Sequence, residues 1–502
     1  MANTTTVPSA AGSAANPATA GLSTPGTTGT TLTPARMWRA LPILLLGAFL
    51  PVLDAFIVNV ALANIGTDLG ASEAQLELTV SGYGVAYACT LVAGGRLGDR
   101  YGRRRLFLAG MAGFTVMSAA CGLAPNVTTL IAFRILQGLT AALMFPQVLA
   151  AVQAGFEGAD RQRAVGMFGV VVGSAGAVGQ IVGGLLLEAD LFGSDWRPLF
   201  LVNVPVGIFA LAVAGRVVPE TKAPVATRID VRGAVGLAAA IALLLIPLTL
   251  GRSQDWPVWT WICLAAVVPA AVLFVVTQRR MERAGATPLV PPSLLQLPAA
   301  RYALGAMVVF ALSIGGLMFS LAMLLQVGHE FSPIRSGLAM AAAAAGFLLI
   351  SVYAQRLVGR YGPKLLIVGA LLFAAGFAGF AAVAAGTEDA LNLPELLGPL
   401  FVLGIGWGMV MVPLLGLSLS ALPVDRAGLA GGVLSTAMQV GLATGASLLG
   451  STLFSTIGKH PTADDWRTGT LVVAAILITL SLITAALAAK LARVIREAAA
   501  AR

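Results

Sequence analysis

The sequence predicts an all-α integral membrane protein with fourteen transmembrane helices, arranged as two six-helix bundles with two inserted helices between them. Three observations lead to this prediction. The 502 residues are 58% hydrophobic and only 11% charged, whereas soluble domains carry about 25% charged residues. Apolar runs of roughly 18 to 25 residues, long enough to cross the hydrocarbon core as helices, follow one another along the chain. A short motif also occurs twice, once in each half.

The apolar runs define the spans and their orientation. They cover residues 41–62, 78–97, 107–124, 128–151, 165–187, 198–215, 233–250, 258–277, 303–326, 337–358, 365–385, 397–421, 428–450 and 470–490. An even number of spans puts both termini on one side. That side holds 25 of the 31 Lys and Arg residues, against five on the other side and Arg134 within a span. Because cytoplasmic loops concentrate Lys and Arg, we expect a plasma-membrane protein with both termini in the cytoplasm.

The same bias explains the net charge of +9 without a nucleic-acid partner, and the basic loops are expected to contact membrane lipid. The domain boundaries follow from the spans. We expect a disordered cytoplasmic tail at 1–35, a first bundle at 36–220, an inserted two-helix segment with cytoplasmic linkers at 221–300, a second bundle at 301–492 and a second tail at 493–502. The three cysteines lie in apolar runs without metal-ligand spacing, so neither a metal nor a cofactor is expected.

The repeated motif relates the two halves of the chain. The stretch "RLGDRYGRRRL" (Arg96–Leu106) aligns with "RLVGRYGPKLL" (Arg356–Leu366), 260 residues later. Each copy joins two spans on the cytoplasmic side, so the repeat is parallel. An offset of eight spans fits two six-span bundles separated by a two-span insertion. Parallel repeats about an axis along the membrane normal are typical of secondary transporters.

Two ionisable side chains, Asp54 and Arg134, lie clearly inside predicted spans. A charge at this depth costs at least about 2.5 kcal/mol, so such a residue is a functional candidate. The helical rise places Asp54 about 12 Å and Arg134 about 9 Å below the outer face. Tyr87, Gln137 and Gln180 fall in the same layer.

Three roles for Asp54 remain open from the residues alone. It can be one half of a structural ion pair that holds the bundle together. It can instead be a titrating carboxylate that loads and releases a proton, since burial raises the pKa of a carboxylic acid and a nearby cation lowers it. Finally, it can bind a cationic substrate directly.

The remaining site predictions concern helix packing and the substrate cavity. Glycines recur every three or four residues in the fifth span, a pattern that lets helices approach closely; they are Gly173, Gly176, Gly179, Gly183 and Gly184. Packing alone would also explain them. The second bundle has no clear intramembrane carboxylate, and Met-rich surfaces accept many ligands. The predicted cavity residues are Asp54, Tyr87, Gln137, Gln180, Met318, Phe319, Trp407, Met409, Met411 and Gln439.

Four motifs resemble those of a known family in order and topology. "GRLGDRYGRRR" resembles the signature loop of the major facilitator superfamily, and "FRILQGLTAAL" resembles its fourth-span motif. "LDAFIVNVAL" and "WRPLFLVNVPVG" resemble the first and sixth spans of its fourteen-span drug:proton antiporters. The chain departs from that pattern at Gln180, where the fifth-span motif has proline, and at Phe56 and Ala63, where the family has threonine and proline.

The resemblance implies roles for the first copy of the repeat. In that family the aspartate equivalent to Asp99 holds the cytoplasmic ends of the bundles together while the outer side is open. A conformational latch is therefore expected from Gly95, Asp99, Arg100, Gly102, Arg103 and Arg104. The fifth-span glycines would seal the interface between the bundles. Asp54 and Arg134 would carry the proton coupling.

These features together predict a monomeric, proton-coupled exporter of lipophilic small molecules, cationic compounds among them, that works by alternating access. The departure at Gln180 leaves open a symporter or uniporter for a small metabolite. A membrane-embedded enzyme is disfavoured, because the sequence shows no Ser/His/Asp set and no His cluster. It also shows no phosphate-binding loop, which argues against an ATP-driven pump.

Overall fold

The computed structural model describes residues 34–221, 230–251, 254–286, 288–386, 391–420, 427–458 and 461–500. Nearly all of the predicted tail at 1–35 and most of the linker that follows the first bundle lie outside these residues. The last helix continues to Ala500, through most of the segment predicted as the cytoplasmic tail at 493–502.

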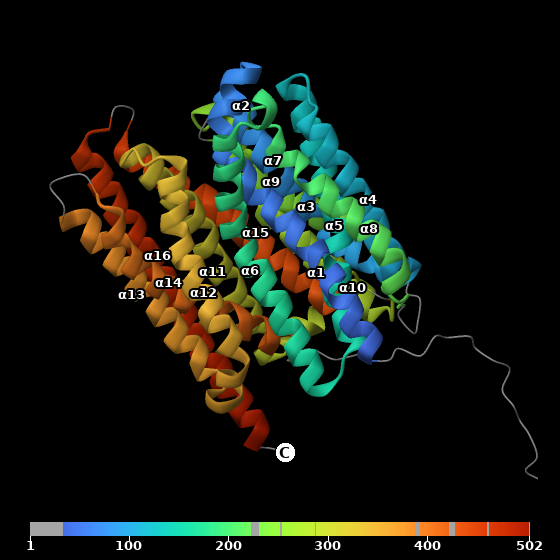
Figure 1. Ribbon diagram of the computed structural model, residues 1–502. Helices are drawn as coiled ribbons and strands as arrows, with labels where there is room; N and C mark the ends of the chain where they lie inside the picture. The colour runs from blue at the N-terminus through green and yellow to red at the C-terminus, as the bar shows by residue number, and fades with distance from the viewer. Residues whose placement is uncertain are drawn as a thin grey trace, which may run out of the picture.

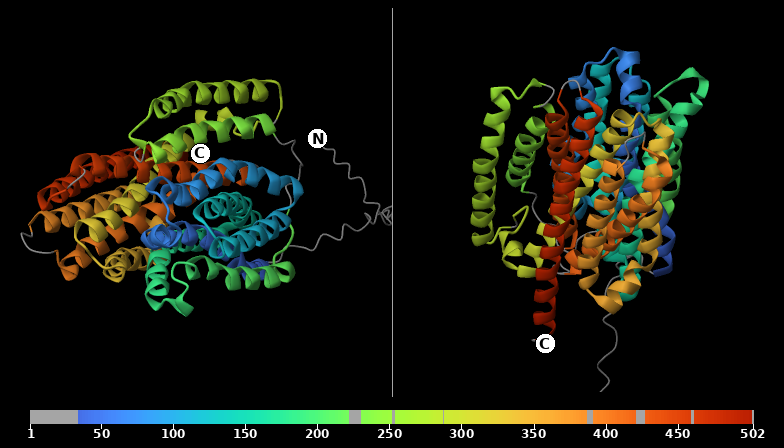
Figure 2. Two further views of the ribbon diagram at one scale, coloured as in Figure 1. Left: turned by 90° about the horizontal axis from the view of Figure 1, so that it is seen from above. Right: turned by 90° about the vertical axis from the view of Figure 1, so that its left-hand side faces the viewer.

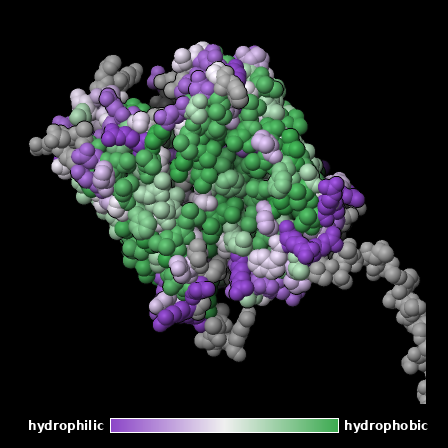
Figure 3. Space-filling view, in the orientation of Figure 1, coloured by the Kyte–Doolittle hydropathy of each residue, from purple (hydrophilic) through white to green (hydrophobic). Residues whose placement is uncertain are grey.

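The described part of the chain contains fourteen helices or helix groups long and apolar enough to cross a membrane, which confirms the predicted fold class. They stand roughly side by side (Figure 1), and apolar residues cover the middle of the molecule between hydrophilic ends (Figure 3). The helices are α1 (Pro34–Ile57), α2 (Leu62–Leu69), α3 (Glu73–Tyr101), α4 (Arg103–Gly122), α5 (Val127–Gly155), α6 (Gly158–Ala189), α7 (Pro198–Leu201), α8 (Asn203–Val217), α9 (Val231–Leu250), α10 (Val258–Arg283), α11 (Pro298–Met323), α12 (Pro333–Tyr361), α13 (Lys364–Gly386), α14 (Leu393–Ser420), α15 (Ala427–Ile457) and α16 (Ala463–Ala500).

Two irregular points in the described helices lie near the candidate site. After α1 the first span tightens into a 3₁₀ turn at Val58–Ala61 before α2 continues it. The sixth span is divided at Val202 into α7 and α8. Pro205 has no backbone N–H to donate to the carbonyl of Leu201, so the helical hydrogen-bond ladder is broken at this point.

The helices form two bundles and a separate hairpin. Helices α1 to α8 make the first bundle and α11 to α16 the second; between them, α3 packs against α15, and α6 packs against α12 and α14. The inserted helices α9 and α10 lie side by side on one flank of the molecule (Figure 2). Helix α9 contacts both α3 and α15, so it covers the seam between the bundles on that flank. Large apolar side chains of α10 such as Trp261 and Val268 are exposed, as expected of a lipid-facing helix.

The turns after α3 and α12 show the internal repeat in three dimensions. Gly102 and Gly362 occupy equivalent turns with φ of 106° and 59°, a region that favours glycine. The guanidinium before each turn covers a tyrosine ring: the Arg100 Cζ lies 5.4 Å from the Tyr101 ring centroid, and the Arg360 Cζ lies 5.5 Å from that of Tyr361. The side chains therefore repeat together with the sequence.

Candidate functional site

The centre of the candidate site is a fully buried ion pair between α1 and α5. Nη1 of Arg134 donates to Oδ2 of Asp54, and neither side chain is exposed. The second carboxylate oxygen, Oδ1, accepts from Nε2 of Gln137 at 3.0 Å and from Nδ2 of Asn203 at 2.8 Å. All three neighbours are donors. An ionised carboxylate only accepts hydrogen bonds, so this arrangement fits the charged form of Asp54.

Arg134 is fixed by contacts beyond the ion pair. Its Nε donates to the carbonyl of Thr79 at 3.0 Å, and its Nη1 also donates to Oε1 of Gln137 at 2.8 Å. The guanidinium lies over the ring of Tyr83, with 4.3 Å from Cζ to the ring centroid. Its Nη2 is buried and has no hydrogen-bond partner among the described residues. The guanidinium therefore keeps one free donor in a site without exposed surface.

Asn203 belongs to this cluster, although it is not among the site residues predicted from the sequence. It is the first residue of α8 and is buried, with 1% relative exposure. Its Nδ2 also contacts Oγ of Ser118 at 3.1 Å, and the Ser118 hydroxyl donates to the carbonyl of Phe200 at 2.8 Å. The signal in the sequence was an amide inside the apolar sixth span. An amide has no charge to mark it, and depth alone does not show which way a helix face points.

The structure brings together only part of the predicted polar layer. Gln137 joins Asp54 and Arg134, whereas Tyr87 lies farther along α3, with its ring 5.9 Å from that of Tyr83. Gln439 of α15, another predicted cavity residue, lies beside the Tyr87 hydroxyl, so these two residues meet across the interface between the bundles. Gln180 is buried in α6, and no hydrogen bond of the described residues joins it to the cluster.

The predicted cavity residues of the second bundle make mainly packing contacts in this conformation. The Trp407 ring lies 5.1 Å from that of Phe347, and Phe347 in turn contacts Gly173 of the first bundle. Phe319 packs against Phe454 of α15 at 6.3 Å between ring centroids. The three methionines predicted for the cavity, Met318, Met409 and Met411, are all buried. Met409 packs closely against Gly369: a Cβ added at Gly369 would lie 2.7 Å from the Cβ of Met409.

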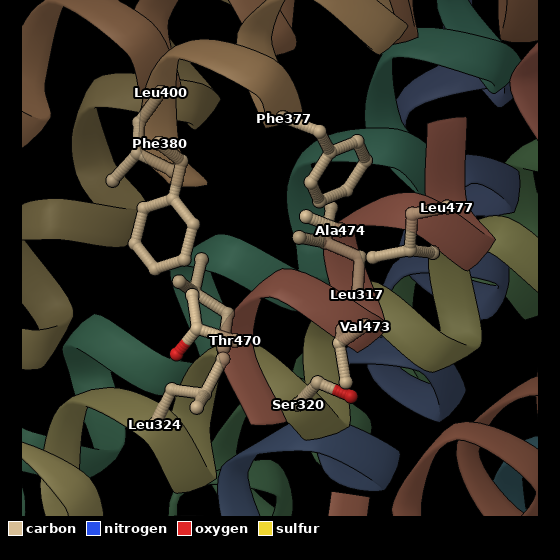
Figure 4. Close-up of a pocket in the computed structure, with 11 residues that line it drawn as sticks. Leu317, Ser320, Leu324, Phe377, Phe380, Leu400, Thr470, Val473, Ala474 and Leu477 are labelled. Atoms are coloured by element: carbon tan, nitrogen blue, oxygen red, sulfur yellow. The ribbon is translucent and has the colours of Figure 1, made fainter. Parts of the chain in front are cut away.

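A small apolar pocket lies inside the second bundle (Figure 4). Side chains from α11, α13, α14 and α16 line it, among them Leu317, Phe377 and Leu400. Its volume of about 10 Å³ is room for one water molecule at most. This pocket is too small to bind a substrate in this conformation.

The fifth-span glycines pack against two different neighbours. Gly176, Gly179 and Gly183 face α1, and a Cβ at Gly179 would lie 2.8 Å from the carbonyl oxygen of Leu53, next to Asp54. Gly173 instead faces Phe347 of α12 across the bundle interface, and Gly184 is buried. The stripe therefore holds α6 against the helix that carries Asp54 as well as against the second bundle.

The predicted latch residues lie at the turn between α3 and α4. Asp99 pairs with Arg103 at 2.9 Å, and Arg103 also donates to the carbonyl of Ala150 in α5 at 3.1 Å. Arg104 donates from its backbone N–H to Glu220, which follows α8, at 3.2 Å. A Cβ at Gly102 would lie 2.6 Å from the Glu220 carboxylate.

These contacts join α3, α4, α5 and the end of α8. Gly95 is buried in α3, and Arg100 covers Tyr101. Within the described residues the contacts of Asp99 stay inside the first bundle. Residues 421–426, between α14 and α15, lie outside that description.

The first and sixth spans meet a second time at the end of the molecule that carries α2. Asp68 of α2 accepts from Nη1 of Arg197 at 2.7 Å and from Nε1 of Trp196 at 2.9 Å. These two hydrogen bonds, first that from Arg197, hold the pKa of Asp68 below its ordinary value. The segment from Trp196 to Asn203 thus contacts one carboxylate at each end. Among the described residues no group of three or more His, Cys, Asp or Glu side chains could hold a metal ion.

Two helix bundles related by a parallel repeat, with a sealed ion pair inside one of them, define a membrane transporter. The comparisons identify the family. The family model of the Major Facilitator Superfamily matches residues 44–233 and 231–446. The chain belongs to this superfamily, which indicates a role in transport rather than in catalysis.

Proteins similar to this chain include bacterial exporters and resistance proteins. The chain is 36% identical to a "Probable actinorhodin transporter" of Streptomyces coelicolor, over 88% of this chain and 77% of that protein. It is 34% identical to the "Tetracenomycin C resistance and export protein" of Streptomyces glaucescens, over 84% and 77%. It is also 30% identical to the "Multidrug resistance protein Stp" of Mycobacterium tuberculosis, over 81% and 74%.

Solved structures agree on the fold. The proton:xylose symporter XylE superposes with a TM-score of 0.61 at 15% identity, covering 89% of this chain and 95% of the other. The human organic anion transporter MFSD10 gives 0.58 at 17% identity, covering 91% and 98%. At such identities the likeness concerns the fold alone.

Proposed function

We propose that the protein exports lipophilic small molecules, antibiotics and cationic compounds among them, in exchange for protons across the plasma membrane. Both termini would lie in the cytoplasm, and the protein would work as a monomer that alternates between inward-open and outward-open states. The buried Asp54–Arg134 pair is the observation that carries the proposal. Relatives named for actinorhodin, tetracenomycin C and multidrug resistance support the direction of transport and the substrate class.

The ion pair supplies the coupling. In the structure Asp54 is held by three donors, which stabilise its ionised form. Protonation removes the negative charge and leaves the Arg134 guanidinium buried without a counter-charge. Breaking a buried pair in this way typically destabilises a protein by about 3–5 kcal/mol. The protonated site therefore favours a rearrangement in which Arg134 reaches water or another partner.

The return step follows from the same contacts. When the rearranged site opens to the cytoplasm, Asp54 releases its proton and the pair forms again. Substrate leaves on the opposite half of the cycle, so the proton gradient drives export. The Asp99–Arg103 hairpin is proposed to stabilise one of the two end states as a latch.

Export assays with two kinds of substrate test this proposal. Cells that lack their own efflux pumps would express the wild type or Asp54→Asn, and accumulation of a cationic dye and of a neutral lipophilic antibiotic would be compared. We expect Asp54→Asn to abolish export of both, because every substrate needs the proton step. Loss of cationic export alone would instead make Asp54 a binding group for cations. Full export of both compounds would rule out either role.

A further inference from the structure

The amide of Asn203 has a bonding pattern that sets it apart from the rest of the cluster. Its Nδ2 donates to Oδ1 of Asp54 at 2.8 Å and to Oγ of Ser118 at 3.1 Å. Its Oδ1 is buried and accepts no hydrogen bond from the described residues. Every polar contact of the side chain therefore comes from the nitrogen. Toward Asp54, Asn203 acts only as a donor.

Ser118 fixes this orientation. Its hydroxyl proton is used in the 2.8 Å bond to the carbonyl of Phe200. Only a lone pair of Ser118 Oγ remains for Asn203, so the Asn203 atom that faces it must be a donor. The chain of bonds from Phe200 through Ser118 holds the nitrogen of Asn203 toward Asp54.

Asn203 is also independent of the arginine. Gln137, the other amide donor to Asp54, is itself bonded to Nη1 of Arg134 and lies on the same helix. Asn203 comes from α8, directly after the helix break that Pro205 imposes. It makes no hydrogen bond to Arg134 in the described structure. Its hold on Asp54 therefore does not depend on where the guanidinium goes.

We propose that Asn203 is a positioning residue that stabilises the ionised Asp54 carboxylate and thereby sets the pH at which the transporter loads its proton. This inference rests on the proposed function, in which Asp54 carries the proton. It adds the sixth span to the coupling machinery.

Few other groups can perturb this carboxylate. The titratable and charged groups that face Asp54 are Arg134 of α5, Tyr83 of α3 and Cys121 of α4. Helix α6 faces it with glycines, and among the described residues α8 contributes only the Asn203 amide. A change in titration on replacing Asn203 can therefore be assigned to the lost donor.

Infrared titration of the purified full-length protein tests the inference without any substrate. The carbonyl band of protonated carboxylic acids grows as the pH falls. The component of this band that is present in the wild type and absent from Asp54→Asn belongs to Asp54. In Asn203→Leu, which has nearly the same shape and no donor, we expect the midpoint of this band to move upward by about one to two pH units. Asn203→Ser keeps a hydroxyl donor and should give a smaller upward shift of the midpoint. This variant replaces Asn203→Leu in the test if the leucine variant does not fold.

A matched control separates the donor from general packing. Thr115 is also buried between α4 and α8, but its hydroxyl bonds to the carbonyl of Met111 in its own helix. Thr115→Ala should leave the midpoint unchanged. An unchanged midpoint in folded Asn203→Leu or Asn203→Ser, with an Asp54 band that still titrates, would overturn the role of Asn203 and leave the proposed function standing. If the wild type shows no titrating band that is absent from Asp54→Asn, both the role of Asn203 and the proposed function would be overturned.

Discussion

At the scale of single residues, Arg134 makes several kinds of contact at once. One nitrogen donates to the backbone of α3, another donates to Asp54 and Gln137, and the flat face covers the Tyr83 ring. These contacts use the planar fork of a guanidinium, which a lysine ammonium cannot reproduce. The geometry therefore explains why an arginine, and not merely a cation, occupies this position.

Arg134→Lys tests this requirement while it keeps the charge. We expect the protein to insert and fold but to export at least about tenfold more slowly, because a lost hydrogen bond to a charged group is worth roughly 1.5–3 kcal/mol. Initial rates of dye export from energised cells, normalised to protein amount, measure the effect. Wild-type rates in Arg134→Lys would show that only the positive charge matters.

The sequence predicted the two charged members of this site and one of its amides. Asp54 and Arg134 stood out because each is an ionisable residue in an apolar run, and Gln137 follows Arg134 on the same helix face. The sequence alone does not show whether the two charges meet; the structure shows that they form an ion pair. Asn203 was missed, since its position depends on the break before α8. Gln180 shares the depth of the cluster but no hydrogen bond of the described chain links it there.

At the scale of elements, α6 and α1 pack almost backbone to backbone beside Asp54. Gly179 contacts the carbonyl of Leu53, and Gly183 lies near Ile57. The sequence predicted the glycine stripe in α6; the family resemblance implied a place at the interface between the bundles, and helix packing alone was the alternative. Three of its members face α1 instead, and Gly173 faces the second bundle. A stripe of small residues shows that a close neighbour exists without showing which helix it is.

Gly179→Ala tests the close approach of these helices. The new Cβ would lie 2.8 Å from the Leu53 carbonyl oxygen, so α1 must move, and overpacking of this kind destabilises by about 1–3 kcal/mol. We expect a lower melting temperature of the purified protein together with slower export. Gly305→Ala is the control, because its nearest neighbour is a Leu487 methyl at 3.7 Å; it should melt no lower than the wild type. Equal melting of both variants would contradict the role of Gly179.

The hairpin between α3 and α4 gives a second test at this scale. Asp99→Asn should insert and express near normally yet export slowly, because the Arg103 guanidinium loses its counter-charge at the turn. Arg105→Gln is the matched control, since the Arg105 side chain is 74% exposed and its ion pair with Glu220 is long, at 4.0 Å. Export rates per molecule would be measured for both. If Asp99→Asn exports at the wild-type rate, Asp99 is not part of a latch, and the basic turn serves only to set the orientation of the helices in the membrane.

At the scale of the whole molecule, the inserted hairpin makes the two flanks of the transporter different. Helix α9 covers the seam between α3 and α15 (Figure 2). The segment after α10 links the inserted hairpin to α3: Arg96 of α3 donates to the carbonyls of Pro288 and Leu289 at 2.6 and 3.1 Å. Asp230 and Gln278 join the two inserted helices at 2.7 Å. The number of spans and the parallel repeat could be predicted from hydropathy and the motif. The helices against which the inserted pair packs could not be predicted, because an apolar helix surface does not specify its neighbour.

Everted membrane vesicles measure the proposed exchange of substrate for protons. Vesicles energised to an acidic interior would receive lipophilic dyes or antibiotics while a trapped pH indicator follows the gradient. We predict that wild-type vesicles take up substrate and lose part of the gradient on its addition, and that Asp54→Asn vesicles do neither. Accumulation of substrate by the wild type with no change in the proton gradient would contradict proton-coupled export.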